Sequence, residues 1–95
     1  PTLQLRYVTG PRRDQTLIFS GRRVRIGRSR DNDVPLPEVE SARASAHHAE
    51  ARRERGGWWI VDLDSMNGTL VNGEPIQRVQ LRTGDRISFG DLEVE

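Results

Sequence analysis

Three short clusters of residues combine glycine with side chains that can bind an anion. They are Gly27-Arg28-Ser29, Ser45-Ala46-His47-His48 and Asp64-Ser65-Met66-Asn67-Gly68-Thr69. An arginine guanidinium donates charge-assisted hydrogen bonds, a serine hydroxyl donates one more, and an asparagine amide both donates and accepts. The arginine fork matches the geometry of carboxylate and phosphate groups. Gly27 and Gly68 would let the main chain turn sharply and keep bulk away from a ligand.

Each of these side chains also has an ordinary structural interpretation, which the residues alone leave open. Arg28 could pair with Asp31 or Asp33 at the end of a strand, and Ser45 could be a plain loop serine. Asn67 could be only the turn residue that an Asn-Gly pair suggests, although that role is compatible with ligand binding. The clusters therefore allow either an anion site or three ordinary loops.

The same residues give little support for catalysis or metal binding. A triad of Ser45, His48 and Asp62 can be imagined, but the Ser-x-x-His spacing comes without a glycine elbow or an oxyanion hole. His47 and His48 are successive residues at the start of a predicted strand, so they point to opposite faces, and no third ligand is spaced nearby. We therefore expect no enzymatic activity, no cofactor and no metal.

The composition describes one small domain with little overall charge. The 95 residues are 34% hydrophobic and 31% charged, with a net charge of +1, only arginine as the cationic side chain, and no cysteine. No apolar run approaches the ~20 residues of a membrane span, and this charge does not attract nucleic acid. We expect a monomeric protein of the bacterial cytoplasm that binds neither membrane nor nucleic acid. Because Pro1 replaces an initiator Met and Glu95 lies in a predicted strand, we expect residues 1–95 to be a single domain of a longer protein.

Short alternating segments separated by turn residues predict an all-β chain. Leu3, Leu5 and Tyr7 alternate with polar residues, and pairs such as Asn72-Gly73 supply the positive φ angles of tight turns. Residues 38–46 are interpreted as a loop, because they lack an apolar stripe and a good helix cap. About ten short strands with frequent turns indicate a sandwich or a barrel. The strands are expected near residues 3–7, 16–19, 23–26, 34–36, 48–53, 58–63, 69–71, 79–81, 86–89 and 92–94.

The order Gly-Arg, Ser-x-x-His and Asn-Gly on an all-β chain resembles the forkhead-associated (FHA) domain family. Asp31-Asn32-Asp33-Val34, Trp59, Asp62-Leu63 and Asn72-Gly73 add to this resemblance, which extends to Phe89-Gly90. It implies an eleven-strand β-sandwich of two twisted, mainly antiparallel sheets, in the class of FHA and SMAD domains. It also implies that loops at one end bind a phosphothreonine-containing protein, either the substrate of a Ser/Thr kinase or the kinase itself.

The resemblance implies a role for each candidate residue. Arg28, Ser45 and Asn67 would bind the phosphopeptide, and Gly27 and Gly68 would shape the loops around it. His48 would be a structural residue whose hydrogen bonds stabilise these loops. Additional contacts could come from Ser29, Arg30, Arg43 and Met66.

Two positions depart from the family's pattern. Members commonly have Arg, Lys or Asn directly after the motif serine, where this chain has Ala46, and Thr before the motif asparagine, where it has Met66. The loop before Ser45 is also longer than usual, and Arg30 or Arg43 could supply replacement contacts. The missing polar groups keep a second hypothesis open, that of an FHA-fold scaffold whose weakened phosphate site mediates phospho-independent interaction or assembly.

Overall fold

The fold is built from short β-strands. The computed structural model describes residues 2–8, 12–36 and 45–89 and the main chain of residues 92–94. The described residues form eleven strands, which confirms the predicted all-β class. They are β1 (Leu3–Arg6), β2 (Thr16–Phe19), β3 (Arg23–Gly27), β4 (Val34–Pro35), β5 (Ala49–Glu54), β6 (Gly57–Asp62), β7 (Thr69–Val71), β8 (Glu74–Ile76), β9 (Arg78–Gln80), β10 (Ile87–Phe89) and β11 (Leu92–Val94). Within this part of the chain, no helix is long and apolar enough to cross a membrane.

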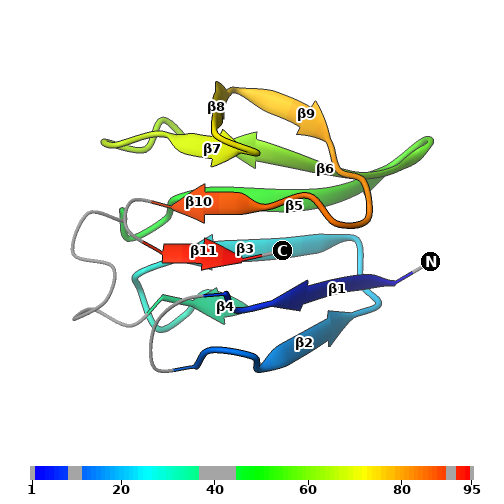
Figure 1. Ribbon diagram of the computed structural model, residues 1–95, viewed down its shortest axis with the longest axis horizontal. Coiled ribbons are helices and arrows are strands. Elements are labelled where there is room, and N and C mark those ends of the chain that lie inside the picture. The colour runs from blue at the N-terminus through cyan, green and yellow to red at the C-terminus, as the bar shows by residue number, and fades with distance from the viewer. Residues whose placement is uncertain (1, 9–11, 37–44, 90–91, 95) are drawn as a thin grey trace.

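Two sheets pack face to face to make the sandwich (Figure 1). One has the strand order β4-β3-β5-β6-β9 and the other the order β11-β10-β7-β8. Among the described strands, β1 and β2 pair only with each other, so the hydrogen bonds define three groups where two sheets were expected. Leu3 and Leu5 of β1 nevertheless belong to the common core. The architecture is therefore the predicted sandwich.

β8 is a strand that the alternation pattern did not predict. It contains Pro75 and has no buried residue, so it carries no inward-facing stripe. The turn before it is formed by Asn72 and Gly73, whose φ angles of 53° and 86° are those of a type I′ hairpin. This Asn-Gly pair was the available signal for the β7–β8 hairpin, in which Thr69 pairs with Ile76.

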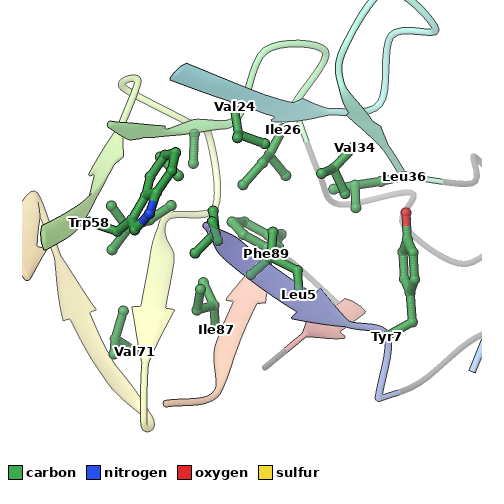
Figure 2. Close-up of a cluster of buried hydrophobic side chains, with 14 residues drawn as sticks. Leu5, Tyr7, Val24, Ile26, Val34, Leu36, Trp58, Val71, Ile87 and Phe89 are labelled. Carbon is green, nitrogen blue, oxygen red and sulfur yellow. The ribbon is translucent and has the colours of Figure 1, made fainter. Parts of the chain in front are cut away.

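The core is formed by side chains at alternate positions of strands from both sheets (Figure 2). Val24 of β3, Ile87 of β10 and Leu5 of β1 come from three different strands, and each is at most 4% exposed. Successive strand residues point to opposite faces, so Trp58 is buried in the core while Trp59 lies on the outer face and is half-buried. In β6, alternation of successive residues thus separates the covered face from the outer face.

The strand register brings three strand ends to one edge of the larger sheet. Ile26 of β3 pairs with Ala49 at the start of β5, and Ala49 pairs with Asp62 at the end of β6. The segments beyond these ends therefore leave the sheet on the same side, at the left in Figure 1. They are the β3–β4 loop (residues 28–33), the β5 approach (residues 45–48) and the β6–β7 loop (residues 63–68). Each holds one of the clusters with anion-binding side chains.

Candidate functional site

Gly27 ends β3 at a place that has no room for a side chain. A Cβ atom there would lie 2.2 Å from the carbonyl oxygen of Ala46. The next two amides use this close approach, since Arg28 N–H donates to the Ser45 carbonyl (3.0 Å) and Ser29 N–H donates to the Ala46 carbonyl (3.1 Å). Gly27 is therefore needed for contact between the β3–β4 loop and the β5 approach. This reason differs from the sharp turn that the sequence suggested.

Asn32 is a site residue that the sequence reasoning missed. Its side chain is buried, and Nδ2 donates to the carbonyl oxygens of Ser29 and Ala46, at 2.8 Å in both cases. One amide group thus ties the β3–β4 loop to the β5 approach. The available signal was an asparagine three residues after Ser29, since such side chains often satisfy carbonyls of their own loop.

The acidic residues of the β3–β4 loop are engaged with close neighbours. The Ser29 hydroxyl donates to the carboxylate of Asp31 at 2.5 Å. This hydrogen bond, together with attraction to His47 and Arg25, lowers the pKa of Asp31 below its usual value. Asp33 accepts a hydrogen bond from the main-chain N–H of Arg25 (2.9 Å). A phosphate would therefore have to compete with Asp31 for the hydroxyl of Ser29.

Ser45 connects the β5 approach to the β6–β7 loop. Its hydroxyl oxygen accepts a hydrogen bond from the main-chain N–H of Met66 (3.0 Å), and its own main-chain N–H donates to Nδ1 of His48 (3.0 Å). The residue is half-buried. Because the hydroxyl acts as the acceptor toward Met66, its own hydrogen is not used in that contact. Ser45 can therefore donate to a ligand without giving up the bond that holds the loop.

His48 is completely buried and also connects the β5 approach to the β6–β7 loop. Its Nε2 donates to the carbonyl oxygen of Gly68 at 2.7 Å, a role that follows from Nδ1 being the acceptor toward Ser45. Its ring also packs edge-on against Phe89, with 5.4 Å between ring centroids. The imidazole thus links the β5 approach, the β6–β7 loop and the core.

The β6–β7 loop presents its tip to solvent. Met66 is 90% exposed, and Asn67 beside it is also exposed. Gly68 has a φ of 82°, and a Cβ there would meet nothing within 4 Å, so this glycine serves the turn that the sequence predicted. Asp64 also has a positive φ, 54°, which asparagine and aspartate tolerate better than other side chains. The loop therefore has a left-handed backbone conformation at both Asp64 and Gly68.

The geometry does not match a catalytic triad or a metal site. His48 accepts from the main chain of Ser45 rather than from its hydroxyl, and Asp62 accepts hydrogen bonds from Ser65 and Thr69. A general base would instead have to contact the nucleophile itself. His47 is exposed while His48 is buried. In the part of the chain that the structure describes, no group of three metal-ligating side chains comes together.

Main-chain and side-chain contacts join the predicted site residues in a row. Arg28 contacts Ser45 through its amide, and Ser45 contacts Met66, the neighbour of Asn67. Both Arg28 and Asn67 are exposed. Arg30, in the same loop as Arg28, is exposed as well. Arg43 and the predicted loop up to residue 44 lie outside the described residues.

Comparison with known proteins identifies the family. The FHA domain model matches residues 24–90. The chain is 44% identical over 71 residues to the ABC transporter ATP-binding/permease protein Rv1747 of Mycobacterium tuberculosis, an alignment that covers 75% of this chain and 8% of the transporter. It is 36% identical over 85 residues to the glycogen accumulation regulator GarA of Mycolicibacterium smegmatis, covering 90% of this chain and 52% of GarA. The chain thus spans about half of GarA and a small part of the transporter.

A solved structure gives the same result for the fold. A structure from a study of phosphothreonine-dependent FHA domain interactions superimposes with a TM-score of 0.86 and 32% identity. The match covers 99% of this chain and 93% of the other. The sequence motifs, the sandwich and both comparisons agree, and the chain belongs to the FHA domain family.

Proposed function

We propose that this domain is an interaction module that binds a phosphothreonine-containing segment of another protein. The binding surface would consist of the β3–β4 loop, the β5 approach and the β6–β7 loop. One observation carries the proposal: hydrogen bonds connect Arg28 to Ser45 and Ser45 to Met66, beside Asn67. A guanidinium, a hydroxyl and a carboxamide thus stand on segments that contact one another. The FHA family and the regulator GarA indicate a non-enzymatic interaction module.

The chemistry of these groups suits a phosphate on an extended peptide. Arg28 would donate charge-assisted hydrogen bonds to the phosphate oxygens, and these are typically stronger than neutral ones. Ser45 would add a hydroxyl donor, polarised by the hydrogen bond that it already accepts from Met66. Asn67 would donate to and accept from the peptide main chain. Because the loops are already tied together, little ordering would be needed on binding, and preorganisation of this kind raises affinity.

The partner in this proposal is a phosphorylated protein, either a Ser/Thr kinase substrate or the kinase itself. The structure from the study of phosphothreonine-dependent FHA interactions supports that class of partner. We further propose that the domain acts as a monomer in the cytoplasm, without nucleic acid or membrane. The absence of cysteine fits a reducing compartment, and the net charge of +1 gives no general attraction for nucleic acid.

A phospho-independent scaffold is the second candidate function, and one observation favours it. The side chains at positions 46 and 66 are exposed and apolar, and Met66 is 90% exposed. An exposed methionine at the tip of a binding loop can contact partners without any phosphate. Under this hypothesis the three loops would bind an unmodified surface.

A phosphothreonine-oriented peptide library, captured beside its unphosphorylated form, separates these functions. We expect the wild-type domain to retain only phosphorylated peptides, and the selected peptide then serves for calorimetry. Arg28→Ala should abolish detectable binding, because charge-assisted hydrogen bonds contribute about 1.5–3 kcal/mol each. Arg55→Ala is the matched control, since Arg55 is also exposed but lies in the β5–β6 turn at the far end of these strands. Equal retention of both peptide forms would instead favour the scaffold.

A further inference from the structure

Asp62, the last residue of β6, is a hub for the loop that follows it. Its Oδ1 accepts hydrogen bonds from the hydroxyls of Ser65 (2.5 Å) and Thr69 (2.8 Å). Its Oδ2 accepts from the main-chain N–H of Ser65 (3.2 Å). Ser65 precedes the loop tip and Thr69 follows it, so one carboxylate holds both sides of the β6–β7 loop.

The main chain that carries this carboxylate is held by hydrogen bonds to two other segments. The main-chain N–H of Asp62 donates to the carbonyl of Gln77 (2.9 Å), and that of Leu63 donates to the carbonyl of His48 (3.0 Å). Thr69 is fully buried at the start of β7. Asp62 and Leu63 therefore connect the β6–β7 loop to Gln77, to His48 of the β5 approach and to Thr69 at the start of β7. Strand pairing and burial set the relative positions of these segments.

The tip of the β6–β7 loop, residues 66–68, is held by two further hydrogen bonds. The Met66 amide is held by Ser45 and the Gly68 carbonyl by His48. Asn67 stands between those two residues, so its direction depends on the loop path that Asp62, Ser45 and His48 define together. Ser45 and His48 hold the tip itself, whereas Asp62 holds the two flanks.

A carboxylate near a phosphate site needs a reason to be there, because like charges repel. A ligand-binding role would place this negative charge against a phosphate that carries about two more. The three donors instead satisfy both carboxylate oxygens from within the loop. The chemistry of Asp62 therefore fits support of the loop and does not fit contact with the ligand.

We infer that Asp62 is a positioning residue of the phosphopeptide site, which orients Asn67 by clamping Ser65 to Thr69. This inference rests on the proposed function. Asp62→Asn keeps the size of the side chain but replaces one acceptor oxygen with an NH₂ group. Turned one way, the NH₂ group faces the main-chain N–H of Ser65, which cannot accept a hydrogen bond. Turned the other way, it faces the hydroxyls of Ser65 and Thr69, which would have to reverse and act as acceptors, and in both cases the charge-assisted hydrogen bonds are lost.

Asp85→Asn is the matched control. The carboxylate of Asp85 is also half-buried and accepts hydrogen bonds on both oxygens, from Asn72 Nδ2 (2.9 Å) and from the Arg82 amide (2.8 Å). It lies beyond the opposite end of β7, away from the three loops. A general cost of losing a carboxylate hub should appear in both variants, whereas a loss of site geometry should appear only in Asp62→Asn.

The test combines calorimetry with the library-selected phosphothreonine peptide, main-chain amide NMR of the free protein, and thermal unfolding. We expect Asp62→Asn to bind about tenfold more weakly at a temperature where it is folded, and Asp85→Asn to bind like the wild type. The Met66, Asn67 and Gly68 amide resonances should move or broaden only in Asp62→Asn. Unchanged resonances and unchanged affinity in Asp62→Asn would overturn the inference, even if its melting temperature fell.

Ser65→Ala provides a milder variant should Asp62→Asn fold poorly. It removes the 2.5 Å hydroxyl donor and leaves the main-chain N–H in place. Its loss of affinity should be smaller, and the two substitutions should be less than additive because they remove a shared contact. Full additivity would count against the clamp. If the wild type bound no phosphothreonine peptide, the proposed function would fail, and the loop resonances alone would decide the role of Asp62.

Discussion

Gly27→Ala should damage the fold and the site together, through a contact that has no space for one methyl group. The new Cβ would lie 2.2 Å from the carbonyl oxygen and 2.8 Å from the carbonyl carbon of Ala46, and 2.9 Å from Nδ2 of Asn32. Two of these three atoms belong to main chain, which cannot rotate aside like a side-chain end. The β3–β4 loop and the β5 approach would have to separate by about 1 Å to reach ordinary van der Waals contact.

The expected cost follows from what that separation breaks. Overpacking in a tight site costs about 1–3 kcal/mol. Three hydrogen bonds across the gap would also weaken, from Arg28 N–H, Ser29 N–H and Asn32 Nδ2 to the carbonyls of residues 45 and 46. Each contributes about 0.5–1.5 kcal/mol net, and partial loss of the three adds about 1–2 kcal/mol. We therefore expect Gly27→Ala to lower the free energy of unfolding by about 3 kcal/mol.

Urea unfolding and thermal melting measure this effect directly, with Gly21→Ala as control. For a domain of this size, about 3 kcal/mol corresponds to a melting temperature lower by about 12–24 °C. A Cβ at Gly21 would meet nothing within 4 Å, and the φ angle of Gly21 lies outside the left-handed region. Gly21→Ala should therefore be neutral or stabilising by up to about 1 kcal/mol. Equal stability of Gly27→Ala and Gly21→Ala would refute the steric argument.

Three further predictions concern other parts of the domain. His48→Ala should lower the free energy of unfolding by about 3–5 kcal/mol, because it leaves a cavity and two unsatisfied main-chain groups. Arg28→Ala should lower it by less than about 0.5 kcal/mol, so equal urea midpoints of the two variants would contradict this prediction. Ala46→Arg with Met66→Thr should tighten phosphothreonine peptide binding about tenfold by restoring two polar groups. Calorimetry showing no gain would mean either that Arg30 or Arg43 already fills that space or that the site is not used for phosphate. Burial raises the pKa of Tyr7, so the contribution of Tyr7 to stability should be constant below about pH 10, where the unfolded state begins to ionise, and should be lost as pH rises toward the folded-state pKa. The chain has no other Tyr and no Lys or Cys, so urea unfolding of Tyr7→Phe should lack this alkaline loss.

Local patterns in the sequence were sufficient for the fold class and for most strands. Alternation required that only one of Trp58 and Trp59 face the core, because successive strand residues point in opposite directions, and the structure places Trp58 there. Turn chemistry accounts for Asn72-Gly73, whose positive φ angles need only the two residues of the turn. β8 was missed because an exposed strand containing Pro75 carries no periodic signal of its own.

The candidate site is different, because its contacts depend on residues far apart in the chain. The motif order was enough to predict the FHA family and to select Arg28, Ser45 and Asn67 as candidates. The sequence did not show that the Ser45 hydroxyl accepts from Met66, which is 21 residues away, or that His48 reaches Gly68 across 20 residues. Asn32 was overlooked because its second acceptor, the Ala46 carbonyl, is 14 residues away.

The strands other than β8, the tight turns and the order of the motifs could be predicted from the sequence, since these depend on residues within a few positions of one another. Tertiary structure decided why Gly27 must be glycine and which atoms Asp62 holds. Both depend on the register of β3, β5 and β6, which brings their ends to one edge of the sheet. Register is set by packing of the whole sandwich, because a shift of one residue would turn every inward side chain outward.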